Sequence, residues 1–338
     1  MTAERAENRA VTIMDPIISP SPGSSSTAEW TVRVPASSAN IGSGFDTLGL
    51  AVDLYLTVRA VFDPGRPGDL KVHVMRGDAS IPRDAGNLIY RALCAAFAAA
   101  HEEVPGVLLA VDSPIPAGSG LGSSAAAIVA GLVLAQSVLG PRCRKAECLR
   151  LATSMEGHPD NVAASFYGGL VAAWRDAAAG DVVVRTIRRD VPLKLLALIP
   201  PEPLATERAR SALPDAYARA DVVDALGKLA LIIAAFQDGD FFELRRLLAD
   251  RLHQPYRFPL IAGADEVLHR AADPRCLGVY LSGAGPTLMA LFADEAARES
   301  WERDIRTLLD ALGWRAMRIA PSPVGAVVET PEGRTIPW

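Results

Sequence analysis

The pattern of apolar and polar positions predicts strands and helices in a mixed order, with no regular strand–helix–strand repeat. In the first half of the chain, β-rich stretches predict strands at residues 31–34, 50–61, 70–75 and 107–111, and a hairpin at 168–174 and 181–187. Helix-forming stretches predict helices at residues 87–101, 123–139 and 144–155. The helix at 123–139 has small or apolar residues on nearly every side, so we expect it to be buried.

The second half of the chain, after Asp190, has a different series of elements. Apolar runs predict strands at residues 193–199, 278–281, 287–292, 314–319 and 325–329. Helical patterns predict helices at residues 220–237, 240–251, 262–272 and 296–312. We therefore predict an α+β fold in two domains, residues 30–190 and residues 191–338.

Composition and charge narrow the classes of function. Apolar residues make up 50% of the 338 positions, and the formal net charge of −5 argues against nucleic acid as a partner. The longest apolar run, residues 125–135, is too short to span a bilayer, so we expect no membrane partner. The four cysteines form no Cys-x-x-Cys pair, which favours free thiols in a reducing compartment over a zinc site.

Residues 1–29 differ from the rest of the chain. The first nine residues are rich in charge without periodicity, and residues 19–27 are rich in serine, proline and glycine. We interpret this segment as a disordered leader without chemistry of its own. Because it lacks the basic start and apolar core of a signal peptide, we expect a cytoplasmic protein.

The most informative motif is a glycine-rich run at residues 116–126. Its members are Pro116, Ala117, Gly118, Ser119, Gly120, Leu121, Gly122, Ser123, Ser124, Ala125 and Ala126. Alternate glycines permit a tight turn, and the free N–H groups at the start of the next helix favour an anion. The run lacks the Gly-Lys-Ser/Thr of a Walker loop and the third glycine of a dinucleotide fingerprint. It predicts a phosphate-binding loop, and a plain turn before a buried helix is the alternative.

Three other motifs carry polar side chains. The first motif, residues 35–46, is a small-residue loop that offers Asn40 and Asp46. The third motif, residues 156–161, places four polar side chains at the end of a predicted helix, namely Glu156, His158, Asp160 and Asn161. A second glycine turn at residues 282–287 is predicted to join two strands and to pack close to these loops. Asn87 is expected to cap a helix, with an adenine contact as the alternative.

Together, in order and spacing, these motifs resemble the galactokinase, homoserine kinase, mevalonate kinase and phosphomevalonate kinase (GHMP) family, from about Val32 to Val328. The first and third motifs, with the basic segments 206–210 and 250–257, are most similar to the homoserine kinase members. The resemblance implies a ribosomal-protein S5-like N-terminal domain and a ferredoxin-like α/β sandwich as the C-terminal domain. It also implies that ATP phosphorylates the side-chain hydroxyl of L-homoserine, which yields O-phospho-L-homoserine for threonine biosynthesis.

The resemblance also implies roles for residues. The glycine loop binds the triphosphate of ATP, and Ser124 and Glu156 hold Mg²⁺, whose usual ligands are oxygens. The residues implied to bind substrate are Asn40, Asp46, His158, Asp160, Asn161, Thr206, Arg210 and Arg257. The two arginines suit the carboxylate, and the carboxylate of Asp46 with the amide of Asn40 suits the ammonium. The implied catalytic residues are His158, Asp160 and Asn161, and Asn161 holds the attacking hydroxyl.

The sequence departs from the family at two points. Glu156 lies only four residues before Asp160, where relatives have a longer insert, and the first motif contains no lysine to assist Asp160. We therefore hypothesise that no strong general base operates. Two other functions remain open, a kinase for another small alcohol such as shikimate or an isoprenoid precursor, and a non-catalytic ATP-binding module. Related enzymes are often dimers, so we expect a homodimer by analogy.

Overall fold

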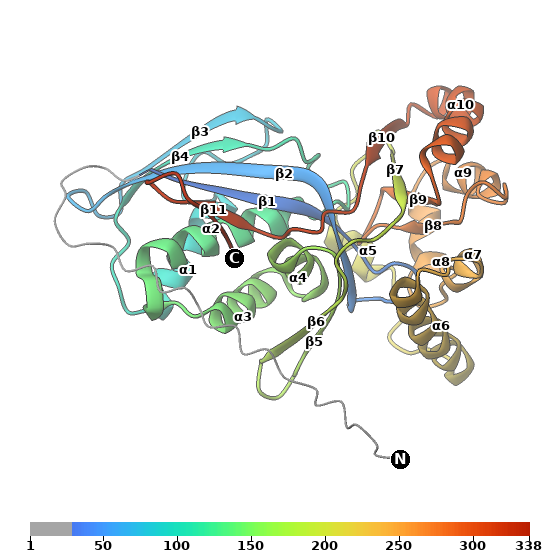
Figure 1. The fold of residues 1–338 in the computed structure, drawn as a ribbon, viewed down its shortest axis with the longest axis horizontal. Coiled ribbons are helices and arrows are strands. Elements are labelled where there is room, and N and C mark those ends of the chain that lie inside the picture. The colour runs from blue at the N-terminus through green and yellow to red at the C-terminus, as the bar shows by residue number, and fades with distance from the viewer. Residues whose placement is uncertain (1–28) are drawn as a thin grey trace, which may run out of the picture.

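The computed structural model describes residues 29–338, which form two β-sheets with helices packed against them (Figure 1). The larger sheet has the order β12-β11-β1-β2-β4-β3, and β5 pairs with both β2 and β6. Its strands are β1 (Glu29–Ala39), β2 (Leu48–Asp63), β3 (Leu70–Arg76), β4 (Gly106–Asp112), β5 (Leu170–Arg175), β6 (Val182–Arg188), β11 (Val327–Glu329) and β12 (Thr335–Pro337). The smaller sheet has the order β10-β7-β9-β8, with strands β7 (Lys194–Ile199), β8 (Gly278–Leu281), β9 (Leu288–Phe292) and β10 (Arg315–Ile319).

The helices form two groups, one with each sheet. Those on one face of the larger sheet are α1 (Leu88–Ala99), α2 (Ser123–Leu139), α3 (Lys145–Glu156) and α4 (Asp160–Tyr167) (Figure 1). Those beside the smaller sheet are α5 (Thr206–Ser211), α6 (Arg219–Asp238), α7 (Leu244–Leu247), α8 (Gln254–Arg257), α9 (Ala264–Arg270) and α10 (Glu295–Leu312). Two short 3₁₀ turns complete the set, Gly140–Arg142 and Phe258–Leu260.

Helix α2 is the centre of the first group and, as expected, is buried. It packs against α1, α3, α4 and β1, and Val129, Leu132 and Val133 have no exposed surface. By length and composition, Ser123–Arg142 is the one segment of the described chain that could cross a membrane, and 61% of its apolar window is buried within the fold. The apolar segment is therefore longer than residues 125–135, and the packing of α2 identifies it as a core helix.

The smaller sheet separates two hydrophobic clusters. Along β7, Leu195 and Ala197 belong to the cluster shared with the larger sheet, whereas Leu196 and Leu198 belong to a second cluster with α9 and α10. Because successive side chains of a strand point to opposite faces, both faces of this sheet are apolar and covered. The smaller sheet is thereby buried between α9 and α10 on one face and the cluster that it shares with the larger sheet on the other.

The structure confirms most predicted elements and corrects three. Strand β1 does not stop at Pro35, because a shift of register between Pro35 and Ala36 lets the proline sit at an irregularity. The helix predicted at 240–251 is wrong: only Leu244–Leu247 is α-helical there, and the side chains of Asp240 and Asp250 accept backbone N–H groups in turns instead.

The other correction concerns the third motif. Helix α3 ends at Gly157, which has a left-handed conformation (φ 93°), and Asp160 begins a further helix, α4, that the sequence pattern did not predict. The third motif therefore lies between two helix ends.

The end of the chain returns to the first sheet. Strand β11 pairs with β1, through Val32 and Val328 among others, although we assigned residues 191–338 to the C-terminal domain. The predicted hairpin of β5 and β6 is confirmed. The predicted leader, residues 1–29, lies outside the described residues apart from Glu29, the first residue of β1.

Gly49 in β2 sets the distance between the larger sheet and α4. A Cβ atom at Gly49 would lie 2.2 Å from the carbonyl oxygen of Asp160. We expect Gly49→Ala to lower the free energy of unfolding by about 1–3 kcal/mol, the usual cost of overpacking, and urea unfolding measures it. Gly65→Ala is the control, because its Cβ would approach only the flexible side chain of Asp63. Equal stabilities for the two variants would contradict this packing.

Candidate active site

A cavity of about 340 Å³ lies where the two groups of elements meet. Its wall comes from the glycine loop, the starts of α1, α2 and α5, the third motif and the second glycine turn. Asn87 lines the cavity and also caps α1, accepting the N–H of Ile89 at 3.0 Å. Its capping role is thus confirmed, and its position on the wall keeps a ligand contact open as a prediction.

The glycine loop leads directly into α2, with Gly122 as the capping residue in a left-handed conformation (φ 68°). A Cβ atom at Gly122 would lie 2.1 Å from Ser37 Oγ, and one at Gly120 would lie 2.4 Å from the carbonyl oxygen of Ser282. Glycine is required for packing this close. No side chain caps α2, so its first backbone N–H groups are available to an anion in the cavity.

The second glycine turn packs against this loop, as expected. The N–H of Thr287 donates to the carbonyl of Ser119 at 3.1 Å, and the hydroxyl of Ser282 donates to the carbonyl of Gly120 at 2.7 Å. Gly283 in the same turn lies on the cavity wall. The turn therefore joins β8 to β9 and also forms part of the site.

The predicted loop residues divide into two sets. Those on the cavity wall are Ala117, Gly118, Ser119, Gly120, Gly122, Ser123 and Ser124. The side chains of Leu121, Ala125 and Ala126 are instead packed in the hydrophobic core, and Pro116 lines a neighbouring cavity. These four residues support the loop from behind, because their side chains do not reach the cavity.

Ser124 and Glu156, predicted to hold Mg²⁺, lie together although they are far apart in sequence. Ser124 stands in the first turn of α2 and Glu156 at the end of α3, and the Ser124 hydroxyl donates to Glu156 Oε1 at 2.6 Å. Burial raises the pKa of Glu156 above its usual value, against the opposing hydrogen bond from Ser124. A half-buried carboxylate and a hydroxyl, both on the wall of this cavity, are a donor set that suits Mg²⁺.

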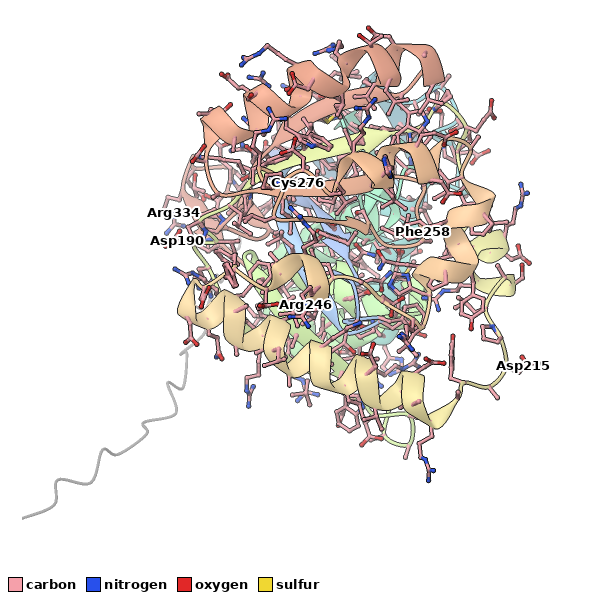
Figure 2. The ribbon with its side chains drawn as sticks, turned by 90° about the vertical axis from the view of Figure 1, so that its right-hand side faces the viewer. Asp190, Asp215, Arg246, Phe258, Cys276 and Arg334 are labelled. Atoms are coloured by element: carbon pink, nitrogen blue, oxygen red, sulfur yellow. The ribbon has the colours of Figure 1, made fainter. Side chains whose placement is uncertain are left out.

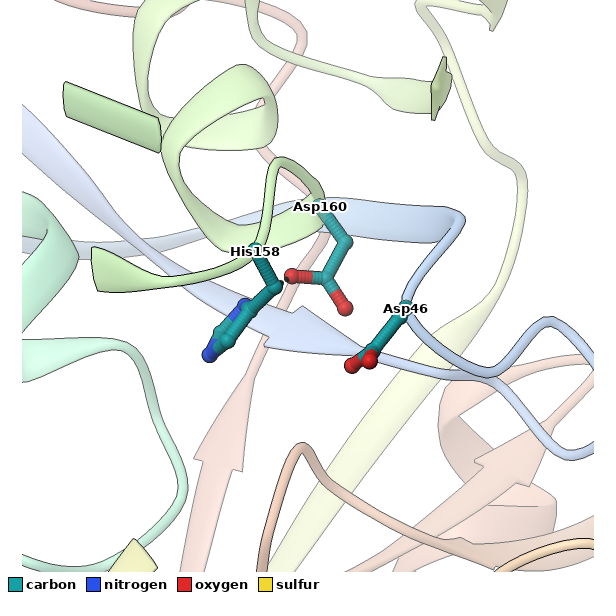
Figure 3. A group of neighbouring side chains, drawn as sticks. All are labelled: Asp46, His158 and Asp160. Atoms are coloured by element: carbon teal, nitrogen blue, oxygen red, sulfur yellow. Dashed lines mark hydrogen bonds and ion pairs between the residues drawn. The ribbon is translucent and has the colours of Figure 1, made fainter. Parts of the chain in front are cut away.

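Within the third motif, His158, Asp160 and Asn161 form a compact hydrogen-bonded group, of which Figure 3 shows His158 and Asp160. Asp160 Oδ1 lies 2.5 Å from His158 Nδ1 and accepts the backbone N–H of Asn161 at 2.7 Å. Burial alone would lower the pKa of His158, but the nearby carboxylates, first that of Asp160, raise it to about 9. His158 is therefore a cation at neutral pH, and its second ring nitrogen points away from Asp160 (Figure 3).

Asp46 faces the same group from the first motif (Figure 3). One ligand atom each from Asp46, His158 and Asp160 lies within 4.8 Å of the others. The guanidinium of Arg210 binds Asp46 in a bidentate manner, at 2.8 Å and 3.1 Å. Because His158 is protonated and Asp46 is paired with Arg210, cations already neutralise these carboxylates, which makes this cluster a poor metal site.

Asn40 ties two loops together. Its Nδ2 donates to the carbonyl of Gly283 at 2.6 Å, and its Oδ1 accepts the N–H of Asp46 at 3.0 Å. It is nearly fully buried, with a left-handed backbone (φ 74°) that asparagine tolerates better than most residues. Both polar atoms of its side chain thus already have partners, and Asn40 fixes the position of Asp46.

Arg257 on α8 is a buried guanidinium without a carboxylate partner among the described residues. It is 1% exposed, its Nε donates to the carbonyl of Ala209, and its Nη1 donates to the carbonyl of Gly283. Burial, and then the charge of Arg210, lower its pKa to about 10. A buried cation of this kind is costly without an anion, and Thr206 and Gly283 of the neighbouring wall open onto the cavity.

The site also contains residues for which the sequence pattern predicts no role. Ser37 donates to Asn161 Oδ1 at 2.9 Å and so orients that amide. Ser38 bonds to the hydroxyls of Tyr280 and Ser282, at 2.8 Å in each case. Ser37 and Ser38 belong to the first motif, so their place in the sequence could have indicated a role in the site. Tyr280 lies on a buried strand, where nothing in the sequence indicates a polar contact. His253, in the basic segment 250–257, is a further residue of the site to which we had assigned no role.

Comparison with known proteins identifies the family. Family models match at residues 87–169, described as the GHMP kinases N terminal domain, and at residues 232–311, described as GHMP kinases C terminal. A homoserine kinase of Deinococcus radiodurans is 39% identical over 314 residues, covering 90% of this chain and 99% of that protein. One of Desulfitobacterium hafniense is 39% identical over 270 residues, covering 79% and 89%. The crystal structure of homoserine kinase from Cytophaga hutchinsonii matches with a TM-score of 0.80 and 28% identity, covering 92% of this chain and 100% of that one. The chain therefore has the two-domain fold of the GHMP kinases and belongs to the homoserine kinases within that family.

Proposed function

We propose that this protein transfers the γ-phosphoryl group of ATP to the side-chain hydroxyl of L-homoserine, which yields O-phospho-L-homoserine for threonine biosynthesis. Its relatives named homoserine kinase support this activity. The main support is the buried guanidinium of Arg257, which has no carboxylate partner in the described chain. It donates to the carbonyl of Gly283, and Gly283 and the glycine loop line the same cavity. The pairing of a phosphate loop with a carboxylate-binding arginine suits the phosphorylation of an amino acid.

The amino acid would be recognised at both ends of its zwitterion. Asp46 is the partner for the ammonium group, and Arg210 and Arg257 are the partners for the carboxylate. Arg210 and Asp46 already bond to one another, so a zwitterion that binds both groups replaces one ion pair with two. Thr206, at the start of α5, and Asn161 lie on the cavity wall beside them, where the hydroxyl chain would extend.

The nucleotide would bind along the glycine loop, with its phosphates at the start of α2. Ser124 and Glu156 would hold Mg²⁺, which neutralises charge that develops on the phosphates. The shorter spacing of Glu156 from Asp160 does not separate it from the loop, because its carboxylate accepts the Ser124 hydroxyl. We propose these two residues as the metal ligands from this chain.

Proton transfer would proceed without a strong general base. His158 carries a proton at neutral pH because its pKa is about 9, so it can donate but not accept one there. Asp160 Oδ1 already accepts two hydrogen bonds, so Oδ2 is the oxygen of this carboxylate whose role the Asp160→Asn variant tests. The hydroxyl would then lose its proton late, to a phosphate oxygen or water, as a loose transition state permits. Asn161, oriented by Ser37, would hold the hydroxyl in line.

We expect MgATP turnover, measured as ADP release, with L-homoserine and not with shikimate or mevalonate. The physical reason is that only the amino acid satisfies both Asp46 and Arg257. L-Homoserine methyl ester is a sharper control, because it keeps the hydroxyl and ammonium but lacks the carboxylate. Turnover with another alcohol alone would overturn the proposed substrate, and no turnover with any of them would favour a module that only binds ATP.

Asp160→Asn tests for a general base. A general base contributes about 10²–10⁴-fold to the rate. Because we propose that Asp160 only orients its neighbours, we expect Asp160→Asn to lower kcat by less than this range. The wild-type rate should fall above about pH 9 as His158 loses its proton. In Asp160→Asn this fall should move to lower pH, because the Asp160 carboxylate is the main group that raises the pKa of His158.

The exposed Asp215 provides the control, Asp215→Asn (Figure 2), for which we expect no change in either quantity. A loss of kcat by several orders of magnitude with unchanged KM would make Asp160 the base.

We also propose a cytoplasmic homodimer formed through the outer face of α6. Val223, Leu226 and Leu231 on this face are 61%, 62% and 56% exposed, and α6 runs along the outer edge of the view in Figure 2. Helix α6 itself begins at Arg219 and ends at Asp238. Two copies packed antiparallel would bring unlike charges together at both ends of an apolar contact, the self-complementary arrangement of a two-fold dimer.

Sedimentation tests the dimer. We expect the wild-type protein to sediment as a dimer and Leu226→Glu to sediment as a monomer, because the two new carboxylates would face one another near the two-fold axis. Met75→Glu, at a 66% exposed residue of β3, should remain dimeric. A monomeric wild-type protein, or a dimeric Leu226→Glu variant, would contradict the proposed interface.

A further inference from the structure

His253 is a fully buried histidine that connects the first motif to Arg257. Its Nε2 lies 3.0 Å from the carbonyl oxygen of Gly42, and its Nδ1 lies 3.3 Å from Arg257 Nη1. A carbonyl only accepts hydrogen bonds, so Nε2 carries the ring proton and Nδ1 is free to accept from Arg257. Burial lowers the pKa of His253 to about 4, although Asp250 opposes this effect, so the ring is neutral at physiological pH.

Both ends of this connection are held rigidly. A Cβ atom at Gly42 would lie 2.7 Å from the backbone of Leu248, so the loop that supplies the carbonyl has no room to shift. Asp250 Oδ2 accepts the N–H groups of His253 and Gln254, at 2.7 Å and 2.9 Å, and fixes the start of α8. The imidazole therefore sits at a set place between two loops that are far apart in sequence.

Phe45 covers the same two side chains. Its ring is stacked on His253, with centroids 5.2 Å apart and an interplanar angle of 19°. The guanidinium carbon of Arg257 lies 5.3 Å from the Phe45 centroid, and that of Arg210 lies 6.0 Å away. The aromatic ring thus contacts both arginines and favours their charges through its face.

These contacts leave Arg257 with one free terminal nitrogen. Its Nε donates to Ala209, and its Nη1 donates to His253 and Gly283. Among residues 29–338, Nη2 has no hydrogen-bond partner, so its two N–H groups are what Arg257 offers to a ligand. The direction of Nη2 depends on the bond that holds Nη1, because the guanidinium is planar and rigid.

We propose that His253, with Phe45 against its ring, is a positioning residue that orients Arg257 so that Nη2 faces the substrate carboxylate. This inference rests on the proposed function, in which Arg257 binds that carboxylate. His253 does not bond to substrate or nucleotide itself, and acts through the acceptor Nδ1. Its effect is therefore confined to the affinity for the amino acid, whereas ATP binding and the chemical step are unchanged.

Two substitutions separate the two hydrogen bonds of the imidazole. In His253→Asn the amide oxygen takes the place of Nδ1 and still accepts from Arg257, but the bond to Gly42 is lost. In His253→Gln the amide nitrogen reaches the place of Nε2 and still donates to Gly42, but the acceptor for Arg257 is lost. Each variant loses one buried bond, so a purely structural role for His253 predicts similar effects on stability and on KM in both.

We expect His253→Gln to raise the KM for L-homoserine roughly tenfold, as for the loss of one hydrogen bond to a charged group, with the KM for ATP unchanged. His253→Asn should keep the KM for L-homoserine within about twofold of the wild type, which is the rescue a positioning role requires. Both variants should show similar losses in thermal stability. The exposed His269 provides the control, His269→Gln, for which we expect no change.

A double-variant cycle completes the test. Arg257→Gln should raise the KM for L-homoserine, and adding His253→Gln to it should cause no further rise, because His253 acts only through Arg257. If His253→Gln does not fold, Phe45→Leu takes its place in the cycle, since it removes the ring that covers both His253 and Arg257.

The outcomes are distinguishable. If Arg257→Gln leaves the KM for L-homoserine unchanged, the proposed substrate site is wrong. If Arg257→Gln raises this KM but the effect of His253→Gln adds to it in full, or if His253→Asn and His253→Gln behave alike, the inference about His253 is overturned and the substrate site stands.

Discussion

The contact on which the rest of the site depends is the packing of the second glycine turn against the glycine loop and the first motif. Ser282 donates to the carbonyl of Gly120, and Asn40 donates to the carbonyl of Gly283. At Gly120 a Cβ atom would collide with the backbone of this turn. These bonds bring the start of α2, which suits phosphates, next to the segments that bear the arginines. Without this contact the phosphate loop and the groups that suit an amino acid would belong to separate surfaces.

Charge in the site is arranged in partly neutralised groups. Asp160 holds a protonated His158, and Asp46 holds Arg210, whereas Arg257 has hydrogen bonds but no carboxylate partner within the described chain. Glu156 is the reverse case, a half-buried carboxylate whose bonded partner is a neutral hydroxyl. Near the arginines, Arg257 thus has no carboxylate partner among the described residues, and near the glycine loop the hydrogen-bond partner of Glu156 is a neutral hydroxyl. Under the proposed function, an amino acid carboxylate and Mg²⁺ would complete the two groups.

Most of the fold was predictable because its signals are local. Helix α2 was predicted at its observed bounds, since a long apolar segment between Gly122 and Gly140 allows few other structures. The family was also predictable, and the matches to GHMP kinases confirm it. The errors occurred where side chains override the pattern: Asp240 and Asp250 turn a predicted helix into loops. The return of β11 to the first sheet was not predictable, because pairing with β1 leaves no trace in the local sequence.

The sequence by itself determined which chemical groups are present: the glycine loop, the polar third motif and the arginines of two basic segments. The tertiary structure decided which of these groups are free to act. Asn40 stays a predicted ligand of the ammonium group, and the structure adds that its amide bonds to two loops. His253 was passed over, although it accepts a bond from Arg257. The reason is physical. A residue type fixes the hydrogen bonds that a side chain can make, whereas burial and neighbours from distant segments fix which bonds remain for a ligand.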